Sequence, residues 1–168
     1  LQGIRIEEET GQVSGIRVTW VTVKNEQGAK KLGKAIGDYV TLEVPMLDAT
    51  DVSYHREITN EVAEQIRRLL PDIKHKRVLV AGVGNREMAP DALGPMVVDH
   101  LFITRHLIQE YGKHSEVTKG MGCVSALAPG VMAQTGIETR EILLGTIRET
   151  KPEVLIVIDA LAARSVKR

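Results

Sequence analysis

The chain has 168 residues, 43% of them apolar and 26% charged, which is typical of one globular domain that buries about two-thirds of its unfolded surface. Its 22 basic and 22 acidic residues cancel, which argues against nucleic-acid phosphates or anionic lipid as the main partner. With one cysteine, 3% aromatic residues, no apolar run of membrane-spanning length and no signal-peptide pattern, we expect a cytoplasmic protein without a disulfide.

The N-terminal part of the chain is predicted to form antiparallel β structure. Residues 3–23 alternate between apolar and polar around a turn near residue 10, which is the pattern of a hairpin. Residues 25–34 are rich in lysine and glycine and are interpreted as a loop. Residues 39–44 form a further predicted strand, which Pro45 ends.

The middle of the chain is predicted to alternate between helix and strand. After Asp51 or Ser53 as N-cap, apolar residues recur at helical spacing up to Pro71. Residues 77–82 have the composition of a buried strand, and a second helix is expected to carry its apolar face over residues 93–108.

The C-terminal part is predicted to continue this alternation. Residues 116–118 are predicted to form a short strand, and Thr135 with Glu138 fits a capping box for a helix reaching about residue 150. Residues 153–159 are a continuous apolar run ending in an acid, typical of a central parallel strand covered on both faces. We therefore expect an α/β fold, a single domain over residues 1–168. Its core is a three-layer sandwich with a mostly parallel central sheet, joined to an N-terminal antiparallel β portion.

Several kinds of chemistry are disfavoured by the motifs. The loop at residues 82–87 begins like a dinucleotide fingerprint but has Glu87 at the third glycine position. Ser125 lacks the flanking glycines of a serine-hydrolase elbow. Cys123 is interpreted as a small buried or loop thiol, because the sequence places no histidine beside it. We expect no cofactor and no bound metal, since none of the five histidines has zinc-site spacing: His55, His75, His100, His106 and His114.

Two acids are better candidates for a catalytic role. Asp91 lies in the loop after the strand at 77–82, and Asp159 is the last residue of the apolar run. Ligands of open α/β sheets bind outside the carboxyl ends of the strands, so both acids are expected in one crevice. One carboxylate would act as base on water and the other as acid on the leaving amine, as peptide hydrolysis requires. The alternative is structural: Asp91 caps the next helix and Asp159 bonds to a turn.

Further loop residues are weaker candidates for the same cleft. An amide or guanidinium there would polarise a carbonyl group, although the predicted capping role of Thr135 favours a structural interpretation of that residue. The basic loop with Lys24, Lys30, Lys31 and Lys34 is interpreted as solvated. The weaker cleft candidates are Asn85, Arg86, Gln134 and Thr135.

Five segments closely resemble the germination protease (spore endopeptidase) family of spore-forming bacteria. They carry the sequences VLVAGVGN, PDALGP, TRHL, LAPGVMAQTGIET and IDALAARS, at residues 78–85, 90–95, 104–107, 127–139 and 158–165. Residues 33–34 and 39–43 match the N-terminal part of the family. The resemblance covers essentially the whole chain.

The resemblance implies an intracellular endopeptidase of the spore core or forespore that degrades small acid-soluble spore proteins during germination. It also implies a self-processing zymogen, a homotetramer without direct nucleic-acid or membrane binding, and a core similar to hydrogenase maturation proteases. The family is regarded as an atypical aspartic protease, and its two essential aspartates correspond by motif to Asp91 and Asp159.

Two alternatives stay open at this point. The chain lacks the family's propeptide motif and stops soon after IDALAARS, so we expect a peptidase domain without its propeptide and C-terminal segment. It would then be either active or an inactive fragment that binds substrate. The other alternative is a metal-dependent peptidase of the hydrogenase-maturation type, using Asp91, Asp159 and a histidine that the sequence does not identify.

Overall fold

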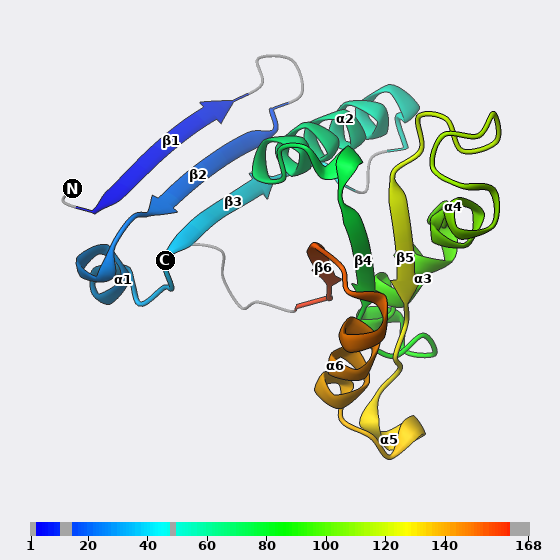
Figure 1. Ribbon diagram of the computed structural model, residues 1–168. Helices are drawn as coiled ribbons and strands as arrows, with labels where there is room; N and C mark the ends of the chain where they lie inside the picture. Colours follow the sequence, from blue (N-terminus) through cyan, green and yellow to red (C-terminus); the bar gives the residue numbers. More distant parts are fainter. Residues whose placement is uncertain (1–2, 11–14, 48–49, 162–168) are drawn as a thin grey trace. The chain divides into compact units, whose positions relative to one another are not determined.

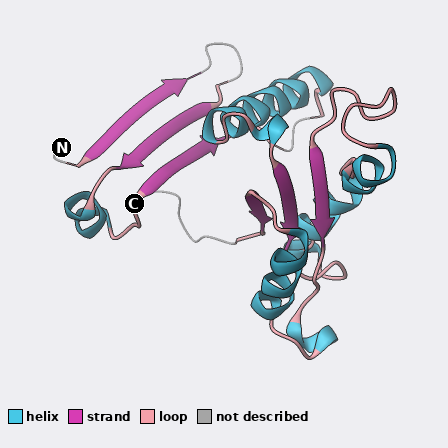
Figure 2. Cartoon of the chain, in the orientation of Figure 1, coloured by secondary structure: helices cyan, strands magenta, loops and turns pink. Residues whose placement is uncertain are grey.

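The computed structural model describes residues 3–10, 15–47 and 50–161. It divides into two compact units, Leu1–Pro71 and Asp72–Arg168, which are described separately below. Each unit contains one three-stranded sheet (Figures 1 and 2). The sequence prediction of mixed α/β structure is therefore confirmed, and the single domain over residues 1–168 stays a prediction.

The first unit is built on an antiparallel sheet, as the alternating sequence predicts. Strands β1 (Ile4–Thr10), β2 (Arg17–Val23) and β3 (Gly37–Glu43) lie in that order. The register places Ile4 opposite Val23 on one side of β2. On the other side of β2, Val23 lies opposite Gly37.

A short helix, α1 (Glu26–Leu32), occupies most of the segment predicted as a loop, so that prediction is wrong. The Asn25 side chain caps the helix by accepting a hydrogen bond from the Gly28 N–H (3.0 Å). Gly33, at φ 64°, ends it in the left-handed conformation that glycine adopts readily. The capping residues at its two ends, rather than the lysine- and glycine-rich composition, define this helix.

Helix α2 (Val52–Leu69) covers one face of this sheet. Asp51 is its N-cap, accepting from the Ser53 N–H (2.8 Å), which decides between the two predicted caps. The core joins Tyr54 of α2 to Val18 and Trp20, alternate residues of β2 that point to the same face. The Trp20 indole N–H donates to the buried Gln65 Oε1 (2.6 Å), so the polar atom of the largest core side chain is paired.

The second unit contains a parallel sheet in the order β5-β4-β6. Its strands are β4 (Arg77–Gly82), β5 (Cys123–Leu127) and β6 (Val154–Ile158). The central strand is β4, which is buried continuously after its first residue. The prediction that the apolar run at 153–159 is central is wrong, because β6 pairs on one side only in the described sheet and Leu155 and Val157 are 41% and 52% exposed.

Helices α3 (Leu93–His100) and α4 (Arg105–Tyr111) pack against this sheet, α3 on β4 and β6 and α4 on β5. They replace the single helix predicted over 93–108. The break covers residues 101–104 and begins at Leu101, which is already extended (φ −77°, ψ 139°). At its end the Thr104 backbone N–H donates to Val124 O (3.0 Å) and the Thr104 hydroxyl donates to Gly122 O (2.5 Å), so these bonds attach the start of α4 to the start of β5.

The remaining short elements correct two further predictions. Residues 116–118 form turns rather than a strand, with Thr118 buried. The capping box belongs to Glu138 and Glu141, not Thr135 and Glu138, because a separate short helix ends at Thr135. The elements concerned are the 3₁₀ turns η1 (Ile73–His75) and η2 (Ala89–Asp91) and the helices α5 (Met132–Thr135) and α6 (Thr139–Thr150).

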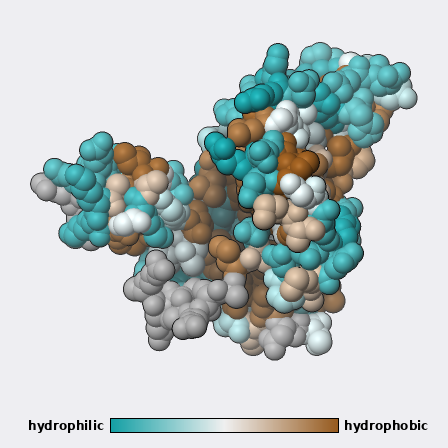
Figure 3. Space-filling view, turned by 90° about the horizontal axis from the view of Figure 1, so that it is seen from below, coloured by the Kyte–Doolittle hydropathy of each residue, from teal (hydrophilic) through white to brown (hydrophobic). Residues whose placement is uncertain are grey.

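We find no helix with the length and apolar character to cross a membrane in the part of the chain that the structure describes. Apolar side chains nevertheless reach the surface (Figure 3). In the second unit they include Leu93 and Met96 of α3, which are 52% and 53% exposed.

Candidate active site

The carboxyl ends of β4 and β6 lie side by side and define one edge of the parallel sheet. Gly82 and Ile158, the last residues of these strands, are register partners. The Val83 N–H donates to Ile158 O (2.8 Å), which extends the pairing into the loop. Asp159 follows β6 directly, and Asp91 ends η2 just before α3. Both predicted acids therefore lie in segments that follow the carboxyl ends of the parallel strands.

Glycines allow α3 to begin directly on this edge. A Cβ atom added at Gly94 would lie 2.3 Å from Val83 O and 2.5 Å from Ile158 O, and one added at Gly82 would lie 2.1 Å from Gly94 O. Only a residue without a side chain allows backbone to approach backbone this closely. Gly94 therefore holds the segment that carries Asp91 against the residue that precedes Asp159.

Asp91 is half-buried and fixes the loop that precedes it. The Asn85 N–H donates to Asp91 Oδ2 (2.7 Å). Gly84, at φ 121°, lies against the same residue, since a Cβ there would be 2.1 Å from Asp91 O. The alternative of a helix cap at Asp91 is wrong, because Ala92 is the N-cap of α3 and no side chain caps it. Among the described residues, Asp91 Oδ1 accepts no hydrogen bond.

Asp159 is exposed, and its Oδ1 accepts from the neighbouring Ala160 N–H (2.9 Å). This is the local turn bond considered as the structural alternative, so that contact is present. Within residues 3–10, 15–47 and 50–161 no donor reaches Asp159 Oδ2. Each of the two acids thus has one carboxylate oxygen that no described residue pairs with.

A hollow of about 330 Å³ opens beside the loop that leaves β4. Of the weaker candidates, Arg86, Gln134 and Thr135 line it, and Gln134 Nε2 donates to Asn85 Oδ1 (3.3 Å). The structure therefore brings the four loop candidates together, while Asp91 and Asp159 are not among the lining residues. The hollow is lined by Gly84, Arg86, Glu87, Pro95, Ala128, Pro129, Gly130, Gln134 and Thr135.

Arg86 is already engaged within the protein. Its guanidinium donates to both carboxylate oxygens of Asp99 on α3, with Nη2 2.9 Å from Oδ1. A bidentate pair of this kind fixes the orientation of the guanidinium. Arg86 therefore shapes the hollow more than it offers a free positive charge to a ligand.

A metal centre is not evident from the arrangement of side chains. In the described ranges, no three or more histidine, cysteine, aspartate or glutamate side chains are grouped closely enough to bind a metal ion. His100 on α3 is bound to Met96 O through its Nδ1 (2.7 Å). Residues 162–165, which complete the IDALAARS motif, lie outside the described residues.

Cys123 lies at the start of β5, opposite Arg77 at the start of β4, and thus at the amino edge of the sheet. It lines a pocket there together with His75, a histidine that sequence spacing did not connect with it. Only strand pairing brings these residues together, so no sequence motif could have found them. The cysteine is separated from the two acids by the length of the strands.

The comparisons with known proteins agree with each other. The family model described as germination protease matches residues 1–168. A germination protease of Caldanaerobacter subterraneus is 42% identical over 168 residues, covering 100% of this chain and 51% of the relative. One from Clostridium tetani is 40% identical over 96% of this chain and 53% of the relative, and one from a Geobacillus species is 40% identical over 100% and 45%. The chain spans about half the length of these relatives.

Proposed function

Because the chain belongs to the germination protease family, we propose that it forms the core of an endopeptidase that degrades small acid-soluble spore proteins during germination. Asp91 and Asp159 are its two catalytic carboxylates. The observation that supports this assignment most strongly is the contact of Gly94 with the Ile158 carbonyl, which brings both acids to one edge of the parallel sheet.

In this mechanism one carboxylate takes a proton from a water molecule, and the water oxygen attacks the carbonyl carbon of the scissile peptide bond. The other, protonated carboxyl gives its proton to the leaving nitrogen as the carbon–nitrogen bond breaks. After one turnover the two groups have exchanged protonation states, and proton transfer through water restores them.

The neighbouring hollow would receive substrate side chains or backbone next to the scissile bond. Asn85 Oδ1 is occupied by Gln134 and by the Glu87 N–H (3.0 Å), which orients the Asn85 side chain. Its Nδ2 amide is then a fixed donor for a peptide carbonyl. In this mechanism Asn85 and Gln134 position the substrate, and the aspartates carry out the proton transfers.

The family resemblance supports several further parts of the proposed function. We propose that the protein is made as a self-processing zymogen, assembles as a homotetramer and acts in the spore core or forespore. Its substrates would be proteins, and it would bind neither nucleic acid nor membrane directly. We also include a three-layer sandwich similar to hydrogenase maturation proteases, as one α/β domain. Light scattering of the purified chain tests the tetramer directly, since a monomer would contradict it.

The first experiment incubates the 168-residue chain with a purified small acid-soluble spore protein and analyses the products by mass spectrometry. We expect internal fragments that appear with time. A stable complex without fragments would overturn the endopeptidase assignment and favour a binding module.

A second experiment distinguishes the paired acids from a metal-dependent mechanism. The chain is dialysed against a chelator and assayed on the same substrate. Unchanged cleavage is expected, because we assign water activation to carboxylates alone. Cleavage that is lost and then restored by a divalent metal would favour the hydrogenase-maturation type of mechanism instead.

A further inference from the structure

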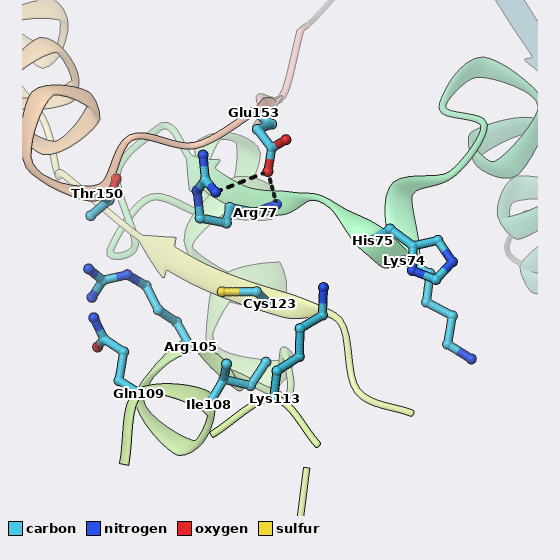
Figure 4. Close-up of a pocket in the computed structure, with 10 residues that line it drawn as sticks. All are labelled: Lys74, His75, Arg77, Arg105, Ile108, Gln109, Lys113, Cys123, Thr150 and Glu153. Atoms are coloured by element: carbon cyan, nitrogen blue, oxygen red, sulfur yellow. Dashed lines mark hydrogen bonds and ion pairs between the residues drawn. The ribbon is translucent and has the colours of Figure 1, made fainter. Parts of the chain in front are cut away.

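A second cavity, of about 300 Å³, lies at the opposite edge of the parallel sheet from Asp91 and Asp159. It opens where the strands begin, at Arg77 of β4 and Cys123 of β5 (Figure 4). Its volume is at the lower end of the range for small-molecule sites in proteins, roughly 300 to 1,000 Å³. The proteolytic mechanism proposed above makes no use of this cavity.

Positive charge is concentrated around this cavity. Lysine and arginine contribute four lining residues, whereas Glu153 is the single acidic one. The chain as a whole has a formal net charge of zero, so this excess is local. The four cations are Lys74, Arg77, Arg105 and Lys113.

The single acid is already committed to one of these cations. Glu153 Oε2 accepts from the Arg77 backbone N–H (3.0 Å) and lies 3.4 Å from Arg77 Nη1. That backbone hydrogen bond is the main cause of the lowered pKa of Glu153, with the nearby positive charges adding to it. Arg77 Nε also donates to Lys151 O (2.9 Å). Arg77 and Glu153 are therefore paired with each other at the cavity wall, and neither charge needs a ligand to balance it.

The other three cations, Lys74, Arg105 and Lys113, have no ion-pair partner in the described part of the chain. Arg105 and Lys113 come from the α4 side of the cavity and Lys74 from η1 (Figure 4). Like charges around one concave site raise the local potential and attract counter-ions. An anion bound here would neutralise charges that the protein leaves unpaired.

The wall between these cations is apolar. Ile108 of α4 and the half-buried Cys123 both line the cavity (Figure 4). Small-molecule sites commonly combine an apolar lining with a few charged groups that fix orientation. The lining therefore fits an organic molecule better than a bare inorganic ion.

We propose that this cavity binds a small organic anion that carries at least two negative charges, as carboxylate or phosphate, on an apolar body. Arg105 and Lys113 bind the charged groups, Lys74 at the rim adds to the local positive potential, and the apolar body lies against Ile108 and Cys123. Arg105 provides a planar fork suited to two oxygens of the same group.

Cys123 is a built-in reporter of this site, because it is the chain's only cysteine. The first test compares its labelling by two methanethiosulfonate reagents of similar size, one with a sulfonate and one with a trimethylammonium group. The ratio of the anionic to the cationic rate is divided by the same ratio for free 2-mercaptoethanol, because a thiolate by itself favours the cationic reagent. We expect this normalised ratio to be about ten, the effect of three nearby positive charges in a largely aqueous setting. A normalised ratio of one would overturn the proposal.

Variants locate the source of that preference. Arg105→Gln and Lys113→Gln should each reduce the normalised rate ratio about twofold, and the double variant should bring it down to about two, the share left to Lys74. Arg140→Gln is the matched control, because Arg140 is exposed on α6 and does not line the cavity. Circular dichroism and thermal unfolding check that each variant folds. An unchanged ratio in a folded double variant would overturn the proposal.

The second test measures protection of Cys123 at constant ionic strength. Adipate and phenyl phosphate are the carboxylate and phosphate probes, 1,6-hexanediol is the neutral match of adipate, and inorganic phosphate lacks the apolar body. We expect adipate, phenyl phosphate or both to slow labelling in the wild-type chain and not in the double variant. The more protective probe identifies the headgroup. Equal protection by hexanediol and adipate would contradict charge recognition, and equal protection by inorganic phosphate and phenyl phosphate would contradict the apolar contact.

Discussion

The two sheets of this protein bury their strands in different ways. In the antiparallel sheet, β2 packs one face against α2, and the strongly buried positions, such as Val18 and Trp20, alternate. In the parallel sheet, β4 is buried at every position from Val78 to Gly82, because strands flank it on both sides and helix α3 packs closely on it. In the first unit the close backbone approach, of Gly28 to Gly3 O, lies between α1 and the residue before β1, whereas in the second unit Gly94 of α3 lies directly against the loop after β4 and the last residue of β6.

This difference determines where functional side chains from several strands can lie close together. In the antiparallel sheet successive strands run in opposite directions, so the loops leave from both edges. In the parallel sheet all carboxyl ends lie at one edge and all amino ends at the other. Asp91 and Asp159 lie at the first of these edges. The cavity lined by Arg105, Lys113 and Cys123, called the cationic cavity below, lies at the second. Both proposals therefore concern the parallel sheet.

The largest structural effect is expected from Gly94→Ala. Its new methyl group would lie well inside contact distance of two carbonyl oxygens, and backbone atoms on both sides cannot move aside. We expect the second unit to lose about 3 kcal/mol or more of its free energy of unfolding. Urea unfolding is followed by Cys123 labelling for this unit and by fluorescence of Trp20, the chain's single tryptophan, for the first.

The matched control for that substitution is Gly145→Ala. Gly145 lies within α6 and has open space where a Cβ would be, so alanine should stabilise the helix by about 0.5 to 1 kcal/mol. If Gly94→Ala leaves the Cys123 transition unchanged, the close-approach account of the second unit is wrong. If the Trp20 transition shifts equally, the two units unfold together as the single domain predicted from the sequence.

A smaller effect, confined to the first unit, is expected from Gln65→Ala. The substitution removes the acceptor of the buried Trp20 N–H, and an unpaired buried donor costs roughly 1 to 3 kcal/mol. The Trp20 fluorescence transition should move to lower urea concentration. Arg67→Ala, an exposed position on the same helix, should change it by less than about 0.5 kcal/mol. Equal shifts in the two variants would contradict the role of the hydrogen bond.

The smallest effect is a pH dependence in the first unit. The pKa of Glu7 is lowered from 4.5, chiefly by its hydrogen bond from Arg68 (2.6 Å). A carboxylate with a lowered folded-state pKa contributes stability above its unfolded-state pKa and loses it as pH falls through the folded-state value. The contribution is small because both partners are reached by water.

Glu7→Gln should therefore weaken the loss of stability on acidification below pH 4.5. Thermal unfolding by Trp20 fluorescence at a series of pH values measures this dependence, with Glu8→Gln on the same strand as control. An acid dependence as steep in Glu7→Gln as in the wild-type chain would show that this carboxylate makes no pH-dependent contribution.

The sequence predicted five of the six strands in the described part of the chain, because their signals are local; it missed β5 (Cys123–Leu127) and placed a short strand at residues 116–118, where the structure has turns. Alternation marked β1 and β2, and a short apolar run marked β4. The same kind of run did not reveal that β6 is an edge strand in the described sheet, since position in a sheet depends on which strands pair and not on composition. Helix α1 was missed because the Asn25 cap and the Gly33 stop were outweighed by loop-like composition.

The places of the two candidate acids in the fold were predictable, but their contacts were not, and their catalytic role stays a prediction. The rule that ligands bind at the carboxyl ends of parallel strands selected Asp91 and Asp159, and the structure places both there. The hydrogen bond from the Asn85 backbone to Asp91 is a tertiary contact without a sequence signature. The cationic cavity escaped prediction for the same reason, because strand pairing alone brings Arg77 beside Cys123.

The most direct test of the account compares cleavage of a small acid-soluble spore protein by the wild-type chain with cleavage by Asp91→Asn and Asp159→Asn. The control is Asp72→Asn, an exposed aspartate in the same unit at φ 63°, a left-handed position that asparagine also accepts. Each of the two site variants should fold normally and lose at least about a hundredfold in rate, as removal of a general acid or base typically does. The control should retain full activity. Near-normal cleavage by either folded site variant would contradict the assignment of the paired acids.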